Sequence, residues 1–289
     1  MNNNISNIKI KINPLDNSIE QIVLKKLNKN PPESYDKIGT EELDLIFSHI
    51  IQNFPQSQTE NFSTQIILSI RANMMREHMI QTHKKILSKE KSIVQDYKNK
   101  MELKKIVSKY DGSPLNLLRI IFFNMYNKKL TAIIKNKKIL SQYDLTQLDW
   151  AISHDAYALI NQDDILTKSN EFEEKIKFIL DKLNVKYKTQ NDLYREQIKS
   201  NNKPTNTPDF LIQDNLYLNG IKINWIDAKN FYGSKSKFMI KKIKSQTEKY
   251  IRTWGTGSII FNLGFNSTLE IENILMVDFK SFQNISNNE

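Results

Sequence analysis

Two apolar stretches separated by Asn219-Gly220 constrain the fold of this chain more than any other feature. They lie in the segment TPDFLIQDNLYLNGIKINWIDAK, which runs from Thr207 to Lys229. An Asn-Gly pair between stretches rich in Leu, Ile, Tyr and Trp is the strongest local signal for a tight turn between antiparallel strands. The segment therefore predicts a β-hairpin.

The second strand of this hairpin carries charges at the end of an apolar face. Side chains alternate along a strand, so the spacing predicts one shared face for Ile221, Ile223, Trp225, Asp227 and Lys229. A carboxylate and an ammonium at the end of a buried face are costly unless they contact each other or a metal ion. The pattern therefore indicates an ion pair or a metal site.

Asp209 adds a second carboxylate at the start of the first apolar stretch. Two carboxylates suit Mg²⁺, which keeps several waters and takes its remaining ligands from phosphate oxygens. With Lys229 to orient or help deprotonate an attacking water, Asp209 and Asp227 supply the residue types for metal-assisted phosphodiester hydrolysis. The pattern alone leaves open the alternative of a solvated ion pair at a strand end.

An acidic residue two positions before a lysine is by itself a weak signal, because the chain has 42 Lys and Arg residues. The same spacing recurs at Asp278-Phe279-Lys280, which also follows an apolar stretch. Asp227 differs because the single Pro-Asp dipeptide of the chain, Pro208-Asp209, lies at the start of the first strand of the same predicted hairpin. This pairing is the reason for placing the candidate site at Asp227.

The register of the hairpin decides whether Asp209 reaches that site. With a plain two-residue loop, Asp209 falls opposite Asn230 and points away from Lys229. A one-residue offset corrects this. We predict the offset either as a three-residue loop at 218–220 with a left-handed glycine in a bulge, or as an equivalent bulge before Phe210.

The TPDF and WIDAK motifs resemble the PD-(D/E)xK nuclease superfamily, and more closely the codanin-interacting nuclease family. That family has a Thr-Pro-Asp-Phe strand, a turn that contains glycine, and a strand reading Trp-Ile-acidic-x-Lys. The resemblance covers residues 169–265 well and the helical half in outline. It includes Glu171-Phe172-Glu173, Gln246, Tyr250, Trp254-Gly255-Thr256-Gly257 and Gly264-Phe265.

The resemblance implies a restriction-endonuclease-like α+β domain whose mixed sheet is flanked by helices. It also implies that Mg²⁺ or Mn²⁺ binds Asp209, Asp227, Glu173 and the backbone carbonyl of Ala228. The implied catalytic residues are Asp209, Asp227, Lys229, Glu173 and Gln246. Without the resemblance, Glu173 is better explained as a first-turn carboxylate that the helix dipole favours.

The stretch after the hairpin is strongly basic. Its predicted helix carries seven cations against one carboxylate, Glu248, and the whole chain has a formal net charge of +10. Such a tract beside the site suits the phosphate backbone of nucleic acid, although a solvated helix face is the usual meaning of such a run. The tract does not distinguish DNA from RNA, and DNA is the partner that we expect more. The candidate nucleic-acid-binding residues are Lys235, Lys237, Lys241, Lys242 and Lys244.

The rest of the chain divides into an arm and a helical domain. Residues 1–38 are Asn-rich and predict an irregular arm, with IKIKI as a candidate edge strand. Residues 39–164 show helical periodicity, including a solvated Lys-rich helix over about 86–110 and a helix capped by Ser113. This domain fits either a helix-turn-helix-like module or a bracing helical bundle. We predict that residues 165–289 form the nuclease-like domain.

Composition excludes several other classes of site and protein. The chain has no Cys, which removes disulfides, thiolate zinc sites and Cys nucleophiles. His78 and His83 are five residues apart, so they point in different directions on a helix and disfavour a two-His metal pair. Without a signal-peptide pattern or a long apolar run, we expect an intracellular protein of the nucleus or cytoplasm with no membrane partner.

Together these features predict an Mg²⁺-dependent endonuclease, or a structure-selective nuclease, that acts by in-line attack of water on a phosphodiester. Two alternatives remain. One is a non-catalytic nucleic-acid-binding module. The other is a protein with a residual nuclease fold that binds a codanin-like partner, as the resemblance implies.

Overall fold

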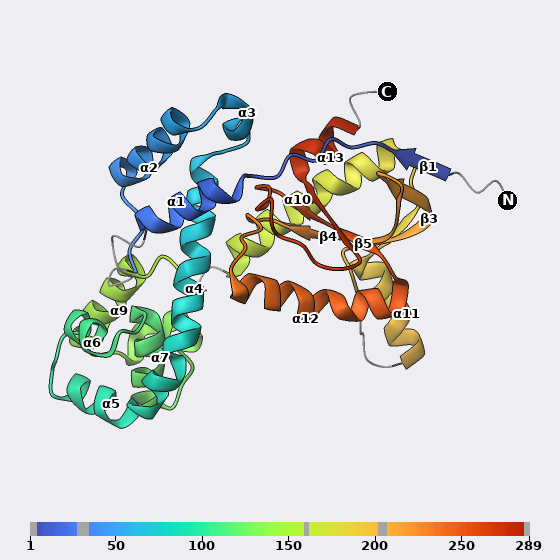
Figure 1. The fold of residues 1–289 in the computed structure, drawn as a ribbon. Helices are drawn as coiled ribbons and strands as arrows, with labels where there is room; N and C mark the ends of the chain where they lie inside the picture. The colour runs from blue at the N-terminus through green and yellow to red at the C-terminus, as the bar shows by residue number, and fades with distance from the viewer. Residues whose placement is uncertain (1–4, 28–34, 159–161, 202–206, 286–289) are drawn as a thin grey trace. The chain divides into compact units, whose positions relative to one another are not determined.

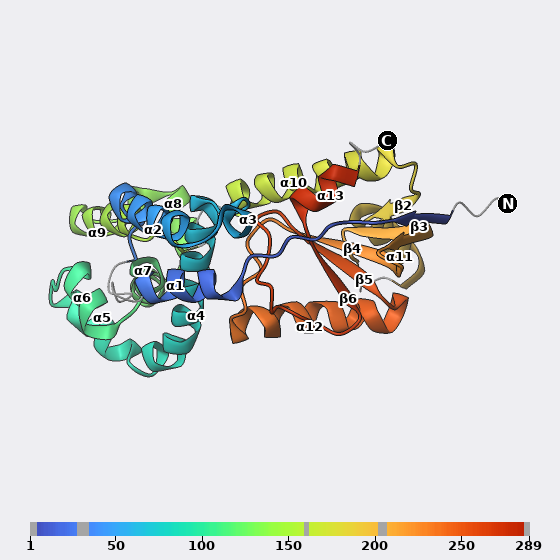
Figure 2. The same cartoon turned by 45° about the horizontal axis from the view of Figure 1, so that its top comes forward.

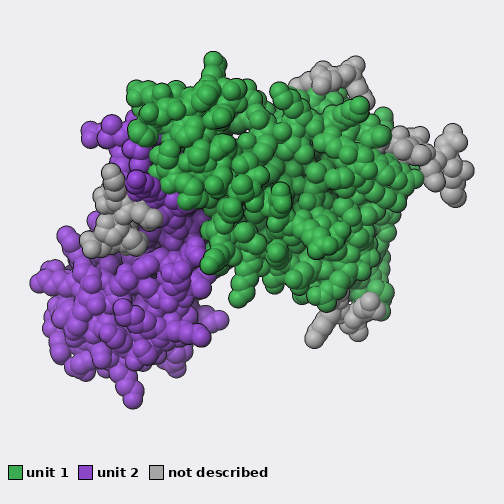
Figure 3. Space-filling model, in the orientation of Figure 1, with its two compact units in different colours: residues 1–22, 47–69, 163–289 green, residues 23–46, 70–162 purple. Residues whose placement is uncertain are grey.

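The structure is a computed structural model of the 289-residue chain, and it describes residues 5–27, 35–158, 162–201 and 207–285. The chain forms two compact units, which Figure 3 distinguishes by colour. Unit 1 comprises residues 1–22, 47–69 and 163–289, and unit 2 comprises residues 23–46 and 70–162. The chain therefore passes between the units more than once, whereas the sequence predicts a single passage near residue 164.

Unit 1 is built around a six-stranded mixed sheet (Figure 1). The order is β1-β3-β4-β5-β6, and β2 also pairs with β3. The hairpin strands β3 and β4 are antiparallel, whereas β4, β5 and β6 are parallel, so their carboxyl ends share one edge. The strands are β1 (Ile5–Ile8), β2 (Tyr187–Thr189), β3 (Phe210–Leu218), β4 (Ile221–Lys229), β5 (Gly257–Phe261) and β6 (Ile274–Asp278).

Helices cover both faces of this sheet. Figure 2 shows α10 (Gln162–Lys182) and α13 (Phe279–Ile285) over one face and α12 (Lys237–Trp254) over the other. The first face buries Phe172 of α10 with Ile226, and the second buries Ile243 of α12 with Trp225. The unit therefore has the predicted α+β class, with a mixed sheet between helices.

The N-terminal residues do not form the predicted irregular arm. They contribute the edge strand β1, upstream of the predicted IKIKI strand and parallel to β3, and the helix α1 (Asn17–Leu27). Glu20 of α1 is only 1% exposed, and its carboxylate accepts hydrogen bonds from Tyr232 Oη, Ser234 Oγ and Asn266 Nδ2 at 2.9, 2.6 and 2.6 Å. These bonds hold α1 on the loops after β4 and β5. Residues 1–4 and 28–34 of the predicted arm lie outside the described residues.

Unit 2 is helical, and much of its buried core comes from short helices. Ser113 Oγ accepts a hydrogen bond from the Asn116 amide at 3.3 Å, with Pro114 at the first helical position, as predicted. The helices of this half of the chain are α2 (Thr40–Asn53), α3 (Gln56–Thr59), α4 (Thr64–Ser88), α5 (Glu90–Lys98), α6 (Leu103–Tyr110), α7 (Pro114–Tyr126), α8 (Leu130–Lys135), the 3₁₀ turn Lys137–Ile139 and α9 (Gln142–His154); α3 and parts of α2 and α4 belong to unit 1.

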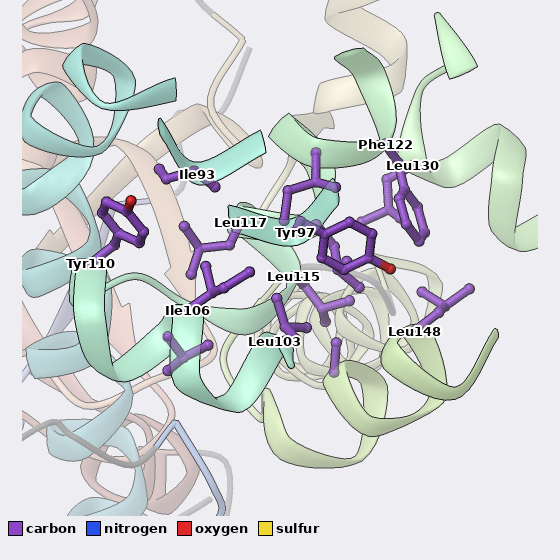
Figure 4. Packing of buried hydrophobic residues seen from close by; sticks show 14 of the residues in the cluster. Ile93, Tyr97, Leu103, Ile106, Tyr110, Leu115, Leu117, Phe122, Leu130 and Leu148 are labelled. Carbon is purple, nitrogen blue, oxygen red and sulfur yellow. The ribbon is translucent and has the colours of Figure 1, made fainter. Parts of the chain in front are cut away.

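The predicted solvated helix over 86–110 is wrong. The segment 90–110 forms two helices, α5 and α6, separated by a turn in which Lys100 has a φ of 64°. Tyr97 and Ile106 are at most 1% exposed and pack in the core of unit 2 (Figure 4). One apolar residue per turn is enough for a buried stripe, because the lysines between them point away from it.

Two polar segments of unit 1 form helices. Residues 190–201 form α11 (Gln190–Asn201), and residues 202–206 lie outside the described residues. The predicted domain boundary between residues 164 and 165 lies inside α10, which begins at Gln162. Glu173 therefore lies well inside a helix and not in its first turn.

No helix in the described ranges combines the length and the hydrophobicity needed to cross a bilayer.

Candidate active site

The predicted hairpin is confirmed, but its turn is the plain two-residue type. Leu218 pairs with Ile221, and the two turn residues Asn219 and Gly220 have φ of 52° and 78°. Positive φ at both central residues is the signature of a type I′ turn. The predicted three-residue loop is therefore wrong.

The register offset lies inside the hairpin. Leu216 pairs with Ile223, whereas Leu211 pairs with Trp225, so four residues of β3 lie opposite a single residue of β4. The irregularity follows Leu211, not the predicted position before Phe210. Extending the pairing by one position beyond Phe210–Ile226 places Asp209 opposite Asp227. Because the shift is by an odd number of residues, it turns Asp209 to the face of Asp227 and Lys229.

The same irregularity interrupts the predicted common face of β4. Ile223 packs in the core beneath α10, while Trp225 packs in the core beneath α12. The period of two is therefore broken at Asn224. Only the last part of the predicted face, from Trp225 through Asp227 to Lys229, follows one side of the sheet, toward α12.

Trp225 anchors the end of β4 from below the site. Its ring is fully buried, and its Nε1 donates a hydrogen bond to the Gly255 carbonyl at 2.9 Å. A Cβ on Gly257 would stand 2.1 Å from the Trp225 ring, so only glycine allows this packing. The Trp225–Gly257 contact holds β4 against β5 immediately before the charged residues.

Asp227, Lys229 and Gln246 form a closed polar cluster at the carboxyl end of β4. Gln246 Nε2 donates to Asp227 Oδ1 at 3.1 Å, and Lys229 Nζ donates to Gln246 Oε1 at 3.0 Å. Lys229 Nζ also forms an ion pair with Asp227 Oδ2. Asp227 is 1% exposed, and its Oδ2 has no hydrogen bond besides that ion pair within the part of the chain that the structure describes.

Asp209 joins this cluster through the backbone of β4. Its Oδ2 accepts a hydrogen bond from the Ala228 amide at 2.6 Å. Because the N–H and C=O groups of one strand residue point to the same side of the strand, the Ala228 carbonyl also points toward Asp209. A second connection runs through Tyr250, whose hydroxyl accepts from Gln246 Nε2 at 3.4 Å and donates to the Thr207 carbonyl at 3.3 Å.

The carboxylates of the site repel one another. Burial, then the charges of Asp227 and Glu173, hold the pKa of Asp209 well above its usual value of 3.8. Burial and the charge of Asp227 also raise the pKa of Glu173. Glu173 on α10 is therefore electrostatically part of the site. A bound cation would relieve this repulsion.

Lys229 is held in its charged form. Burial lowers the pKa of its ammonium, but the charge of Asp227 and the contact with it outweigh burial and leave the pKa above the usual value. At neutral pH this side chain therefore donates protons to hydrogen bonds and does not accept one.

The donors of the site fit a metal ion that keeps part of its water shell. Within the described ranges, no three His, Cys, Asp or Glu side chains are arranged as a ready metal site. Mg²⁺, however, is commonly held by one or two carboxylates with water and substrate phosphate as the other ligands. Asp209, Asp227 and the Ala228 carbonyl match that set. The mutual repulsion of the carboxylates and the incompletely bonded Asp227 Oδ2 support the same fit.

The five predicted nucleic-acid-binding lysines are not on one surface. At 100° per helical residue, Lys242 lies on the same flank of α12 as Gln246, whereas Lys244 lies on the opposite face. Lys237, Lys241 and Lys244 line an open hollow of about 450 Å³ on that outer face. Lys235 precedes the helix, and its backbone amide donates to Glu20 at 3.2 Å.

Sequence reasoning missed two asparagines beside the site. Asn262 Nδ2 donates to Asn230 Oδ1 at 2.6 Å, and Asn230 Nδ2 donates to the Lys168 carbonyl on α10 at 2.9 Å. The Asn262 amide also donates to the Lys229 carbonyl at 2.9 Å. Each asparagine directly follows a strand, and this position is the one signal in the sequence that favours them.

Residues 140–280 match the model of a family described as "Protein of unknown function TPD sequence-motif". The matched region contains Thr207-Pro208-Asp209 and the whole polar cluster described above. The region is similar to that TPD-motif family.

A relative with 31% identity over 160 residues is "Uncharacterized protein L539" of Acanthamoeba polyphaga mimivirus. The alignment covers 54% of this chain and 56% of the viral protein, so it spans little more than half of either. No solved structure matches the chain.

Proposed function

We propose that this chain is a metal-dependent nuclease with a restriction-endonuclease-like domain, of the codanin-interacting nuclease type. The observation that carries the proposal is that Asp209, Asp227 and Lys229 gather at the carboxyl end of β4. Glu173 adds a third carboxylate from the helix on the other face of the sheet. The substrate we favour is nucleic acid, with DNA ahead of RNA. The net charge of +10 and the Lys-rich helix beside the site suit the phosphate backbone of either.

Each residue has a distinct role in this proposal. Asp209, Asp227 and the Ala228 carbonyl would hold a Mg²⁺ or Mn²⁺ ion, which would supply charge stabilisation at the phosphate and acidify a bound water. Glu173, predicted as a further ligand, would add its negative charge from α10. Lys229, protonated at neutral pH, orients the attacking water and offsets charge on the phosphate. Gln246 holds Lys229 and Asp227 in place from α12.

A second candidate function is non-catalytic binding of nucleic acid or of a codanin-like partner. The observation that favours it is that the Lys229 ammonium is already engaged by Asp227 and Gln246. If that arrangement persists when nucleic acid is present, the cluster is a structural ion pair at the end of β4.

A cleavage assay separates these functions. Labelled single-stranded DNA, branched DNA and RNA are each incubated with the full chain in Mg²⁺ or EDTA, beside Asp227→Asn. Glu270→Gln, which changes an exposed carboxylate outside the cluster, is the matched control. We expect Mg²⁺-dependent cutting that Asp227→Asn lowers about 100-fold and the control retains.

Binding without cutting, unchanged in Asp227→Asn, supports the non-catalytic module and overturns the nuclease. Absence of both binding and cutting, together with tight binding to a codanin-like protein, supports the partner-binding alternative.

A further inference from the structure

A cavity of about 290 Å³ opens at the carboxyl edge of the sheet, beside the candidate active site. Its walls come from the segment before α1, the turn before α4 and the first turn of that helix, the loop after β5, and the end of β6 with the start of α13. All of these segments belong to unit 1. The candidate catalytic residues do not line it, so it is a separate hollow.

The strand register fixes the distance of this cavity from the candidate site. Lys229 of β4 pairs with Phe261 of β5, which pairs with Asp278 of β6, so the three residues form one row across the sheet. Neighbouring strands are about 4.8 Å apart, which places Asp278 about 10 Å from Lys229 along this row. A nucleic-acid strand covers that distance in about three nucleotides at a rise of 3.4 Å each.

Asn262 connects the cavity with the site. It lines the cavity, and its backbone amide donates to the Lys229 carbonyl at 2.9 Å. Its side chain donates to Asn230, the residue that follows Lys229, at 2.6 Å. A group bound in the cavity is therefore held at a set distance from the lysine of the site.

The lining of the cavity suits a nucleobase. Phe62 and Phe279 offer apolar walls. Asn61, whose Oδ1 accepts from Lys280, offers its Nδ2 as a donor, and Asn262, whose Nδ2 donates to Asn230, offers its Oδ1 as an acceptor. Sites that hold an unstacked base combine apolar faces with polar groups at the edge of the base in this way.

The charges of the cavity exclude a phosphate as its occupant. Its lining carries two carboxylates, Glu60 and Asp278, against one ammonium, Lys280, which donates to Asn61 Oδ1 at 2.7 Å. Both oxygens of Asp278 already accept backbone amides, from Asn13 and Ser281. Glu60 is exposed at the rim, where its Oε1 accepts a hydrogen bond from Asn13 Nδ2. The second carboxylate oxygen of Glu60 remains an acceptor, which favours a base with an exocyclic amino group.

We propose that this cavity binds one nucleobase with an exocyclic amino group, from a nucleotide close to the bond that is cut. The inference rests on the proposed nuclease function and adds a base preference to it. Adenine, cytosine and guanine present an amino group to the acceptor at the rim, whereas thymine and uracil present only an N3–H between two carbonyl oxygens, which a carboxylate repels.

The test uses single-stranded oligonucleotides of one sequence, with 2-aminopurine at successive positions around the mapped cleavage site. The full chain carries Asp227→Asn, so that it binds without cutting. The fluorescence of 2-aminopurine reports a base that leaves the stack. We expect the fluorescence to change when 2-aminopurine is at one position. The change should be lost in Asn61→Trp, which fills the cavity. It should be retained in the control Gln213→Trp, which places the same side chain on an exposed site of β3. Melting temperatures establish that each variant is folded.

Two further measurements complete the test. Asn61→Ala, which removes the amide without filling the cavity, weakens binding of the oligonucleotide about tenfold, and thymine at the responsive position does the same. Suppose that the wild-type chain cuts and that Asn61→Trp leaves the fluorescence change intact. This result overturns the base subsite but not the proposed nuclease. Absence of both cutting and binding in the wild-type chain overturns the proposed function itself, and the subsite with it.

Discussion

Asp209 accepts a hydrogen bond from the backbone amide of Ala228 at 2.6 Å, across 19 residues of sequence and a complete hairpin. This bond requires the odd register shift between β3 and β4, because an uninterrupted hairpin turns Asp209 to the other face. The bond brings the carboxylate of the TPD motif beside the backbone between Asp227 and Lys229. The irregularity in the hairpin is therefore the structural basis of the candidate site.

The raised pKa of Asp209 predicts a pH-dependent response to metal. A carboxyl group whose pKa is higher in the folded state contributes its full stability at pH values below its pKa in the unfolded chain, which is 3.8. That stability is lost as pH rises through the folded pKa. Mg²⁺ should therefore raise the melting temperature more at pH 7.5 than near pH 4, where protons compete with the metal for the carboxylates.

Differential scanning fluorimetry with Mg²⁺ or EDTA at several pH values measures this response. Asp209→Asn should melt higher than the wild type in EDTA at pH 7.5, by a few degrees, and gain little from Mg²⁺. Glu270→Gln should behave as the wild type. A Mg²⁺ effect of equal size at both pH values and in Asp209→Asn would show that the metal binds elsewhere.

Tyr250 should act as a positioning residue for the TPD segment. Its hydroxyl links the Thr207 carbonyl with Gln246, and Tyr250→Phe removes that link while keeping the ring against Trp225. We expect about a tenfold loss of cleavage rate, a loss of stability of about 1 kcal/mol, and an unchanged KM. Tyr194→Phe, at a residue that is 48% exposed, is the control.

Steady-state cleavage kinetics over a pH series measure this effect. A purely structural role for Tyr250 predicts a lower melting temperature with unchanged kcat and pH profile, and that result contradicts the positioning role.

Lys242 and Lys244 provide a matched pair on one helix. Lys242 shares the flank of Gln246 and faces the region that a bound backbone would cross, whereas Lys244 faces away. Lys242→Gln should weaken DNA binding and lower the slope of log affinity against log salt by about 0.9, and Lys244→Gln should change it less. Fluorescence anisotropy at several salt concentrations measures both. Equal effects would place the DNA on the outer face as well.

Gly257 should tolerate no larger side chain. A Cβ there would stand 2.1 Å from the buried Trp225 ring, so Gly257→Ala forces the ring and β4 to move. We expect a loss of about 1–3 kcal/mol of stability from this overpacking, measured by denaturant unfolding. Gly39→Ala, where nothing lies within 4 Å of the added methyl group, is the control. A neutral Gly257→Ala would contradict the role of this contact as the anchor of β4.

Local signals in the sequence predicted the elements whose causes are local. Asn219-Gly220 makes the type I′ turn because both residues accept positive φ, and Ser113-Pro114 begins α7 because the serine side chain caps it. The acidic and basic residues of the site were likewise recognisable from TPDF and WIDAK. Their types and approximate elements required no knowledge of the fold.

Only the tertiary structure decided where the hairpin shifts and how the N-terminal residues fold. Along its other side, β3 pairs with β2 before the shift and with β1 after it, while Trp225 packs over Gly257 on β4. The carboxylate of Glu20 meets partners 212 to 246 residues away. Such contacts leave no periodic pattern in the sequence, because the residues that make them become neighbours only when the sheet has formed.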